Sequence, residues 1–165
     1  MKKAIIFSLA ALMTANAMAI DVKVASPDGK LQVTISDEGG KPTYVVNYDG
    51  KQMMTPSALG LNTNIGDFTQ GLTIKDSKEN SIDSKYTMSR TKTSEVHYQA
   101  NEVNIIMENA KKWPLTVTFR VSNSDVAFRY TLHRGKGNNP KCAVIYSEAS
   151  AFNFPDYTST FICPH

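Results

Sequence analysis

The sequence predicts an all-β fold, an antiparallel β-sandwich, and three observations carry this prediction. Short runs of alternating apolar and polar residues follow one another along the chain, with polar turns between them. No stretch after residue 19 has apolar residues at the i, i+3, i+4, i+7 spacing of a helix over ten residues. Two adjacent runs near residue 120 each present one wholly apolar face, which is typical of sheets with one buried and one solvated side. No repeat or linker divides the chain, so a single domain is expected.

The first 19 residues have the features of a secretory signal peptide. Lys2-Lys3 precede an apolar run over residues 4–13, and Ala17-Met18-Ala19 then fit a cleavage site, with Ala15-Asn16-Ala17 as the alternative. The apolar run is too short to span a bilayer, and no membrane span is expected elsewhere. The residue directly after the cleavage site is Ile20 and not a cysteine, so no lipid anchor is expected there. We predict export to the periplasm, with residues 20–165, a mature chain of 146 residues, forming the domain.

The charge balance argues against nucleic acid or an acidic lipid surface as a partner. The whole chain has 18 Lys and Arg against 15 Asp and Glu. Without Lys2 and Lys3 the balance is 16 against 15, a net charge of +1. The basic character therefore belongs mostly to the leader, and a nearly neutral domain has no electrostatic attraction for phosphate groups.

The expected strands begin with a turn at Pro27-Asp28-Gly29, whose residue types favour tight turns. A second turn, Asp49-Gly50, has the composition of a two-residue hairpin loop. In chain order the expected strands are 31–35, 44–48, 51–54 and 58–63, then the weaker runs 72–74, 86–88, 95–98 and 103–107, the strong runs 115–121 and 126–132, and finally 142–146 and 151–154.

The two strong runs define their own register. A turn centred between Asn123 and Ser124 brings all the apolar side chains to one face, whereas a slip of one residue would scatter them over both faces. The expected pairs are Val121 with Val126, Phe119 with Phe128, Val117 with Tyr130, and Leu115 with Leu132. Both phenylalanine rings are expected to be buried. The opposite, polar face is expected to hold Thr116, Thr118, Arg120, Arg129 and Thr131.

Two residues are candidates for substrate binding. Glu148 lies between Ser147 and Ala149 in an otherwise apolar stretch, but a glycosidase needs two carboxylates at a set distance and no partner is evident. Trp113, the only tryptophan, could stack on a sugar or could serve as a lid on the core at the start of a strand.

The histidines and cysteines give no clear site. His97, His133 and His165 lie far apart, without the close pairs of ligands typical of structural zinc sites. Cys142 and Cys163 are compatible with a disulfide in an exported protein, but the simpler interpretation is two half-buried strand cysteines, since their spacing does not place them within bonding reach.

Five phrases occur in order along the mature chain: "SPDGKLQVTIS" (26–36), "PTYVVNYDGK" (42–51), "PSALGL" (56–61), "FRVSNSDVAFRYTL" (119–132) and "SEASAFNFP" (147–155). Together they resemble the N-terminal domain of glycoside hydrolase family 97, from about Val24 to Phe161. The resemblance implies a galactose-mutarotase-like β-supersandwich, here incomplete, that packs on a (β/α)8 barrel. It also implies a glycosidase, an exported bacterial enzyme that removes α-linked glucose or galactose from oligosaccharides, with calcium at the domain interface in some members.

In such enzymes the catalytic residues lie in the barrel, which takes about 250 residues and is missing from this chain. The resemblance therefore implies no catalytic and no metal-binding residue among residues 20–165, and the chain alone is expected to be inactive. Glucosidase members tend to have a Trp-containing segment where this chain has residues 84–94, which hold none. The expected function is the non-catalytic N-terminal portion of the hydrolase. The alternative is a stand-alone carbohydrate-binding sandwich.

Overall fold

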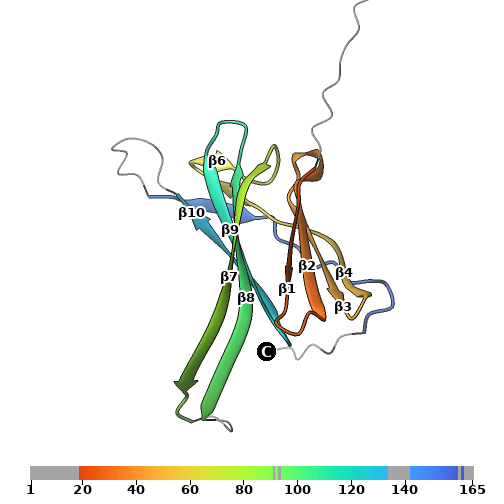
Figure 1. Cartoon of the computed structure of the whole chain (residues 1–165). Helices are drawn as coiled ribbons and strands as arrows, with labels where there is room; N and C mark the ends of the chain where they lie inside the picture. Colours follow the sequence, from red (N-terminus) through yellow and green to blue (C-terminus); the bar gives the residue numbers. More distant parts are fainter. Residues whose placement is uncertain (1–18, 91, 93, 134–141, 160, 162–165) are drawn as a thin grey trace, which may run out of the picture.

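Two four-stranded antiparallel sheets face each other across the core (Figure 1). The structure is a computed structural model, and it describes residues 19–90, 92, 94–133, 142–159 and 161. The first sheet has the order β1-β2-β3-β4, and the long sheet has the order β10-β9-β8-β7. A small sheet, β11-β5-β6, lies at one end. The described residues hold no α-helix, only a 3-10 turn, η1, at Glu38–Gly40. Among them there is accordingly no helix long and apolar enough to cross a membrane.

The strand bounds are as follows. The first sheet consists of β1 (Asp21–Ala25), β2 (Leu31–Ser36), β3 (Thr43–Tyr48) and β4 (Lys51–Ala58). The long sheet consists of β7 (Thr73–Thr87), β8 (Glu95–Glu108), β9 (Pro114–Ser122) and β10 (Val126–Leu132). The small sheet consists of β5 (Leu61–Thr63), β6 (Gly66–Asp67) and β11 (Ile145–Glu148). This architecture confirms the predicted all-β sandwich.

The core lies between the facing sheets because alternate residues of each central strand are apolar. Val33 and Ile35 of β2 are fully buried, as are Ile105 of β8 and Val117 of β9. Burying each such side chain contributes about 1.5–3 kcal/mol to stability. The alternation thus fixes which face of each strand points inward.

The predicted register of the β9–β10 hairpin is confirmed at every pair, from Val121 with Val126 to Leu115 with Leu132. The expectation that both phenylalanines are buried was only half right. Phe119 is fully buried, whereas Phe128 is half-buried because β10 is the edge strand of the long sheet. The ring of Phe128 is covered on one side by Phe152, with 6.0 Å between the ring centroids.

The Asp49-Gly50 turn is also confirmed. It connects β3 to β4, and both residues have positive φ, 48° and 75°, as a type I′ hairpin turn requires. Pro56 lies inside β4, which is an edge strand and tolerates the missing N–H.

The single strand predicted over residues 58–63 is wrong. Gly60, with φ 141°, interrupts it, so that β4 ends at Ala58 and β5 starts at Leu61. The Gly60 backbone passes so close to Phe68 that an added Cβ would lie 2.5 Å from the Phe68 carbonyl oxygen. The break therefore lies where the chain leaves the first sheet and enters the small sheet.

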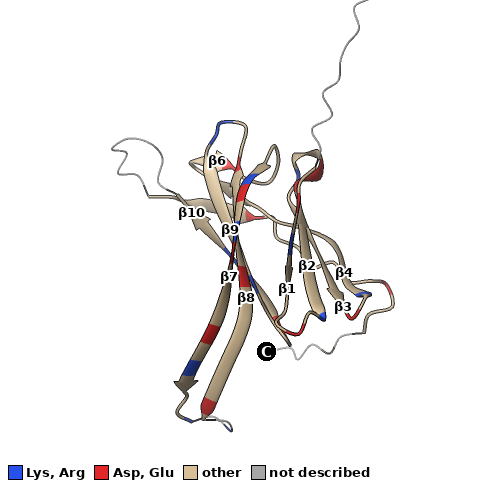
Figure 2. Ribbon diagram, viewed as in Figure 1, with Lys and Arg blue, Asp and Glu red and all other residues tan. Residues whose placement is uncertain are grey.

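The four weak runs expected between residues 72 and 107 are in fact two long strands. β7 has 15 residues and β8 has 14, and they form one hairpin that projects beyond the first sheet (Figure 1). Both faces of the projecting part reach water, so its sequence lacks the alternation that marks a half-buried strand. Charged residues of both signs are spread along β7, namely Lys75, Asp76, Lys78, Glu79, Asp83 and Lys85 (Figure 2).

Two further corrections concern short or terminal segments. The strand expected at 142–146 is β11, Ile145–Glu148, and residues 151–154 form no regular strand. Residues 151–154 instead lie alongside β4 and are joined to it by irregularly spaced backbone hydrogen bonds. These include Ala151 N to Ala58 O at 3.0 Å and Thr55 N to Asn153 O at 2.9 Å. β1 and the two-residue β6 were not predicted. β6 is too short for a pattern to show, whereas the alternation in β1, with Val22 and Val24 buried, was missed.

Candidate functional site

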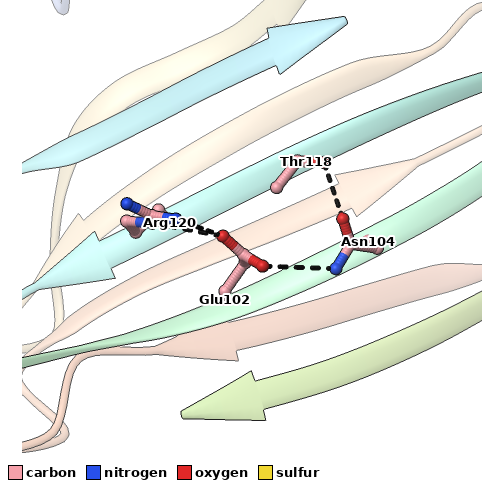
Figure 3. Close-up of polar contacts among 4 residues, drawn as sticks. All are labelled: Glu102, Asn104, Thr118 and Arg120. Carbon is pink, nitrogen blue, oxygen red and sulfur yellow. Dashed lines mark hydrogen bonds and ion pairs between the residues drawn. The ribbon is translucent and has the colours of Figure 1, made fainter. Parts of the chain in front are cut away.

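A polar network lies on the outer face of the long sheet, the face turned away from the first sheet (Figure 3). It consists of Glu102 and Asn104 on β8 and Thr118 and Arg120 on β9. The register places Glu102 opposite Arg120 and Asn104 opposite Thr118. Strand alternation sends these four side chains outward while Val103 and Phe119 point into the core.

The network is centred on the carboxylate of Glu102. Arg120 donates to Glu102 Oε2 from Nη2 at 2.7 Å and from Nε at 3.2 Å. Asn104 Nδ2 donates to Glu102 Oε1 at 3.4 Å, and Thr118 Oγ1 donates to Asn104 Oδ1 at 2.7 Å. Glu102 is 8% exposed, whereas the Arg120 side chain is 41% exposed. The network is therefore a nearly buried anion held by a cation that still reaches water.

The hydrogen bonds from Arg120 lower the pKa of Glu102, and the charge of Arg129 lowers it further, although burial acts in the opposite direction. The carboxyl group is therefore ionised at neutral pH. A general acid in glycoside cleavage needs a raised pKa. Glu102 is therefore suited to accepting hydrogen bonds and to holding Arg120 in place, and not to donating a proton.

Two hollows border Glu102. A small one of about 150 Å³ lies on the outer face beside Thr118, Arg120 and Arg129. A larger groove of about 660 Å³ lies between the edge of the first sheet and the β7–β8 hairpin. Its lining includes the amides of Gln32, Asn80 and Asn101, together with Lys23 and Glu79. Such side chains can hydrogen-bond to neutral hydroxyl groups, but the groove has no aromatic side chain in its lining.

Trp113 has the position of a core lid. It is half-buried at the start of β9 and packs against the core cluster. Its backbone N–H donates to Asn109 Oδ1 at 3.0 Å, and Asn109 Nδ2 in turn bonds the carbonyl of Asp67 at 3.3 Å. Trp113 thus packs against the core, and a role in sugar binding stays a prediction.

Glu148 ends β11 opposite Leu61, and it is exposed. The apolar surroundings expected from its neighbours do not form, because all four residues of β11 are exposed. Neither Glu148 nor Trp113 takes part in the network around Glu102. Sequence reasoning missed that network, since a carboxylate on β8 and an arginine on β9 become partners only through the β8–β9 pairing.

The described histidines are widely separated. His97 Nε2 lies 2.7 Å from Asp83 Oδ1 on the projecting hairpin, whereas His133 Nε2 lies 2.7 Å from Thr116 Oγ1. Within the described ranges no three His, Cys, Asp or Glu side chains are grouped closely enough to hold a metal ion. Cys142 is exposed, while Cys163 and His165 lie outside the described residues, so the disulfide is not tested.

Comparisons with known proteins agree on one family. The family model for the glycosyl-hydrolase 97 N-terminal domain matches residues 24–165. A retaining alpha-galactosidase of Bacteroides thetaiotaomicron is 28% identical over 157 residues, which cover 94% of this chain and 22% of that protein. A probable retaining alpha-galactosidase of Streptomyces bingchenggensis is 26% identical over 133 residues, 79% of this chain and 19% of that protein.

Solved structures give the same result. A crystal structure of a beta-arabinopyranosidase superposes with a TM-score of 0.82 at 46% identity, over 88% of this chain and 23% of that one. A glycoside hydrolase family 97 enzyme from Pseudoalteromonas sp. strain K8, solved in complex with panose, has a TM-score of 0.74 at 26% identity. The match covers 82% of this chain and 20% of that one. The chain thus spans about a fifth of each relative's length. On the family match and these likenesses, the chain belongs to the glycosyl-hydrolase 97 N-terminal family.

Proposed function

We propose that this chain is the non-catalytic N-terminal portion of an exported bacterial glycoside hydrolase of family 97. The observation that carries the proposal is the family match over residues 24–165 in a chain that spans only about a fifth of its relatives. In this proposal the sandwich supports a catalytic barrel supplied by a longer polypeptide, and the leader directs the protein to the periplasm.

The substrate class of the whole enzyme is proposed to be an α-linked galactoside or a closely related glycoside. Relatives bear the names alpha-galactosidase and beta-arabinopyranosidase, the latter at 46% identity. The two sugars are related, since arabinopyranose has the ring hydroxyls of galactose without the exocyclic hydroxymethyl group. α-Glucosides are the second possibility, because the Pseudoalteromonas enzyme was solved with panose at 26% identity.

One observation supports a non-catalytic role for the chain itself. Every carboxyl group with a resolved shift in the described part of the chain, Asp28, Asp67, Asp83 and Glu102, has a lowered pKa. Glycosidase chemistry instead needs one carboxyl group that stays protonated beside another that is ionised. Calcium, where used, is proposed to bind through residues of the longer protein.

The C-terminal segment supports a partner surface within a longer enzyme. Large apolar side chains are exposed there: Val144, Ile145, Tyr146, Phe152, Phe154, Tyr157 and Phe161. Large exposed apolar areas are rare on monomeric proteins and often mark interaction sites, so this segment is a candidate partner surface. The alternative, a stand-alone carbohydrate-binding sandwich, is favoured by the groove lined with amides and opposed by its lack of an aromatic platform.

Two measurements test the proposal. The coding sequence downstream of codon 165 should encode a (β/α)8 barrel. Purified residues 20–165 should release no nitrophenol from aryl α-galactosides, α-glucosides or arabinopyranosides, with or without calcium. Turnover that survives repurification and is lost in Glu148→Gln would instead place the catalytic pair inside the sandwich. Sugar binding by residues 20–165 together with a stop codon after 165 would favour the stand-alone alternative.

A further inference from the structure

We propose that removal of the first 19 residues creates a charged anchor, in which the new α-ammonium group of Ile20 pairs with the buried carboxylate of Asp37. This inference rests on the export and cleavage that belong to the proposed function. It assigns to signal-peptide cleavage a second effect, the stabilisation of the contact between the two sheets.

The β1–β2 register brings the two residues together. Asp21 pairs with Ser36, so the next residues outward, Ile20 and Asp37, lie opposite each other. The nitrogen of Ile20 donates to Asp37 Oδ1 at 2.9 Å. Asp37 is 7% exposed, although Ile20 itself remains accessible at 44%. The nitrogen that cleavage after Ala19 would free is therefore already within hydrogen-bonding distance of a buried carboxylate.

The second oxygen of the same carboxylate reaches the other sheet. Asp37 Oδ2 accepts a hydrogen bond from the backbone N–H of Ile74 on β7 at 2.8 Å. Next to it, the Gly40 N–H bonds the Asp37 carbonyl at 2.8 Å and closes the η1 turn. Asp37 thus connects the start of β1, the end of β2 and the start of β7, and its charge lies at the junction of the first and long sheets.

In the uncleaved chain this buried anion has only neutral partners. The described residues place no Lys, Arg or His within salt-bridge distance of Asp37. The charged residues within four positions of Ile20, Asp37 or Ile74 in the sequence are Asp21, Lys23, Glu38, Lys41, Lys75, Asp76 and Lys78. A buried charge is costly unless an opposite charge compensates it. Cleavage after Ala19 turns the Ile20 N–H into an ammonium group at the right place, whereas cleavage after Ala17 would leave it a neutral amide.

The first test measures the pKa of the Ile20 α-amine. The chain is produced with its own leader, purified after export, and labelled with a small amine-reactive reagent across pH 6–10. Mass spectrometry of the N-terminal peptide then gives the labelling rate at each pH. An ordinary α-amine has a pKa of about 8. We expect the Ile20 amine to titrate at least about one pH unit higher, and Asp37→Asn to return it to the ordinary value. Asp21→Asn, which changes an exposed neighbouring carboxylate, is the matched control. In this variant most of the rise in the pKa of the Ile20 amine should remain.

A second test does not require the Asp37 variant to fold. A chain that keeps Met18 and Ala19 after cleavage retains Asp37 but presents a neutral amide at Ile20. It should unfold at a lower urea concentration than the chain that starts at Ile20, at pH 6–7, and the difference should vanish above the pKa of the Ile20 amine. An α-amine with an ordinary pKa in a folded wild-type chain, equal urea midpoints for the two chains, or a mature protein that starts elsewhere than at Ile20 would each overturn the proposal. None of these readouts depends on glycosidase activity.

Discussion

Phe119 and Phe128 face each other across the β9–β10 hairpin with their ring centroids 5.4 Å apart and their planes tilted by 35°. Tyr44 of β3 closes the group from the opposite sheet, with its centroid 5.4 Å from Phe119 and 5.6 Å from Phe128. This cluster joins the two sheets near one edge of the sandwich.

The cluster predicts unequal effects of truncating the two rings. Phe119→Ala should lower the free energy of unfolding by about 3–5 kcal/mol, because the ring is fully buried and leaves a cavity. Phe128→Ala should cost less, because its ring is only half-buried. Urea unfolding followed by circular dichroism measures both, and the exposed Arg129→Ala should stay within about 0.5 kcal/mol of wild type. Equal losses for the two phenylalanines would contradict this account of the edge.

The Glu102–Arg120 pair predicts a pH dependence of stability. Because the folded-state pKa of Glu102 is lowered chiefly by Arg120, the pair stabilises the fold above the unfolded-state pKa. This stabilisation is lost as the pH falls through the lowered folded-state pKa. The loss should be about 1 kcal/mol, since Arg120 is partly exposed and water screens the pair. Urea midpoints measured from pH 7 down to pH 3 should therefore fall less steeply in Glu102→Gln than in wild type, and parallel curves would argue against the pair.

Gly60 predicts a steric effect that a second glycine does not share. In Gly60→Ala the new Cβ would lie 2.5 Å from the Phe68 carbonyl oxygen, on top of a φ of 141°. We expect a loss of about 3 kcal/mol or more, and a shift in the connection to the small sheet. Gly29→Ala is the control, because Gly29 also has a positive φ, 75°, but has nothing within 4 Å of the added Cβ. It should cost about 1 kcal/mol. Thermal melts of the two variants compare the losses of stability directly. Similar losses would show that the backbone near Phe68 moves to make room for the added Cβ.

The exposed apolar C-terminal segment predicts poor solubility of residues 20–165. β11 is an edge strand with four exposed residues, including Ile145 and Tyr146. Such an edge promotes association between chains. The double variant Ile145→Thr and Tyr146→Thr should reduce light scattering at a given protein concentration, whereas Met53→Thr, on another exposed apolar residue, should have little effect. An unchanged aggregation rate in the β11 variant would show that this segment is not the sticky surface.

The sequence alone determined the β class, the Asp49-Gly50 turn and the complete register of the β9–β10 hairpin. These features depend on neighbouring residues, on the period of two in a strand and on the positive φ that a type I′ turn requires. The tertiary structure decided the rest. It set the length of the β7–β8 hairpin, whose projecting part is held by its ladder although both of its faces reach water. It also buried Glu102 against Arg120, packed Trp113 against the core and left Glu148 exposed to water. Each of these outcomes depends on which strand becomes a neighbour and which stays at an edge, and strand neighbours far apart in sequence are chosen by packing that no local pattern records.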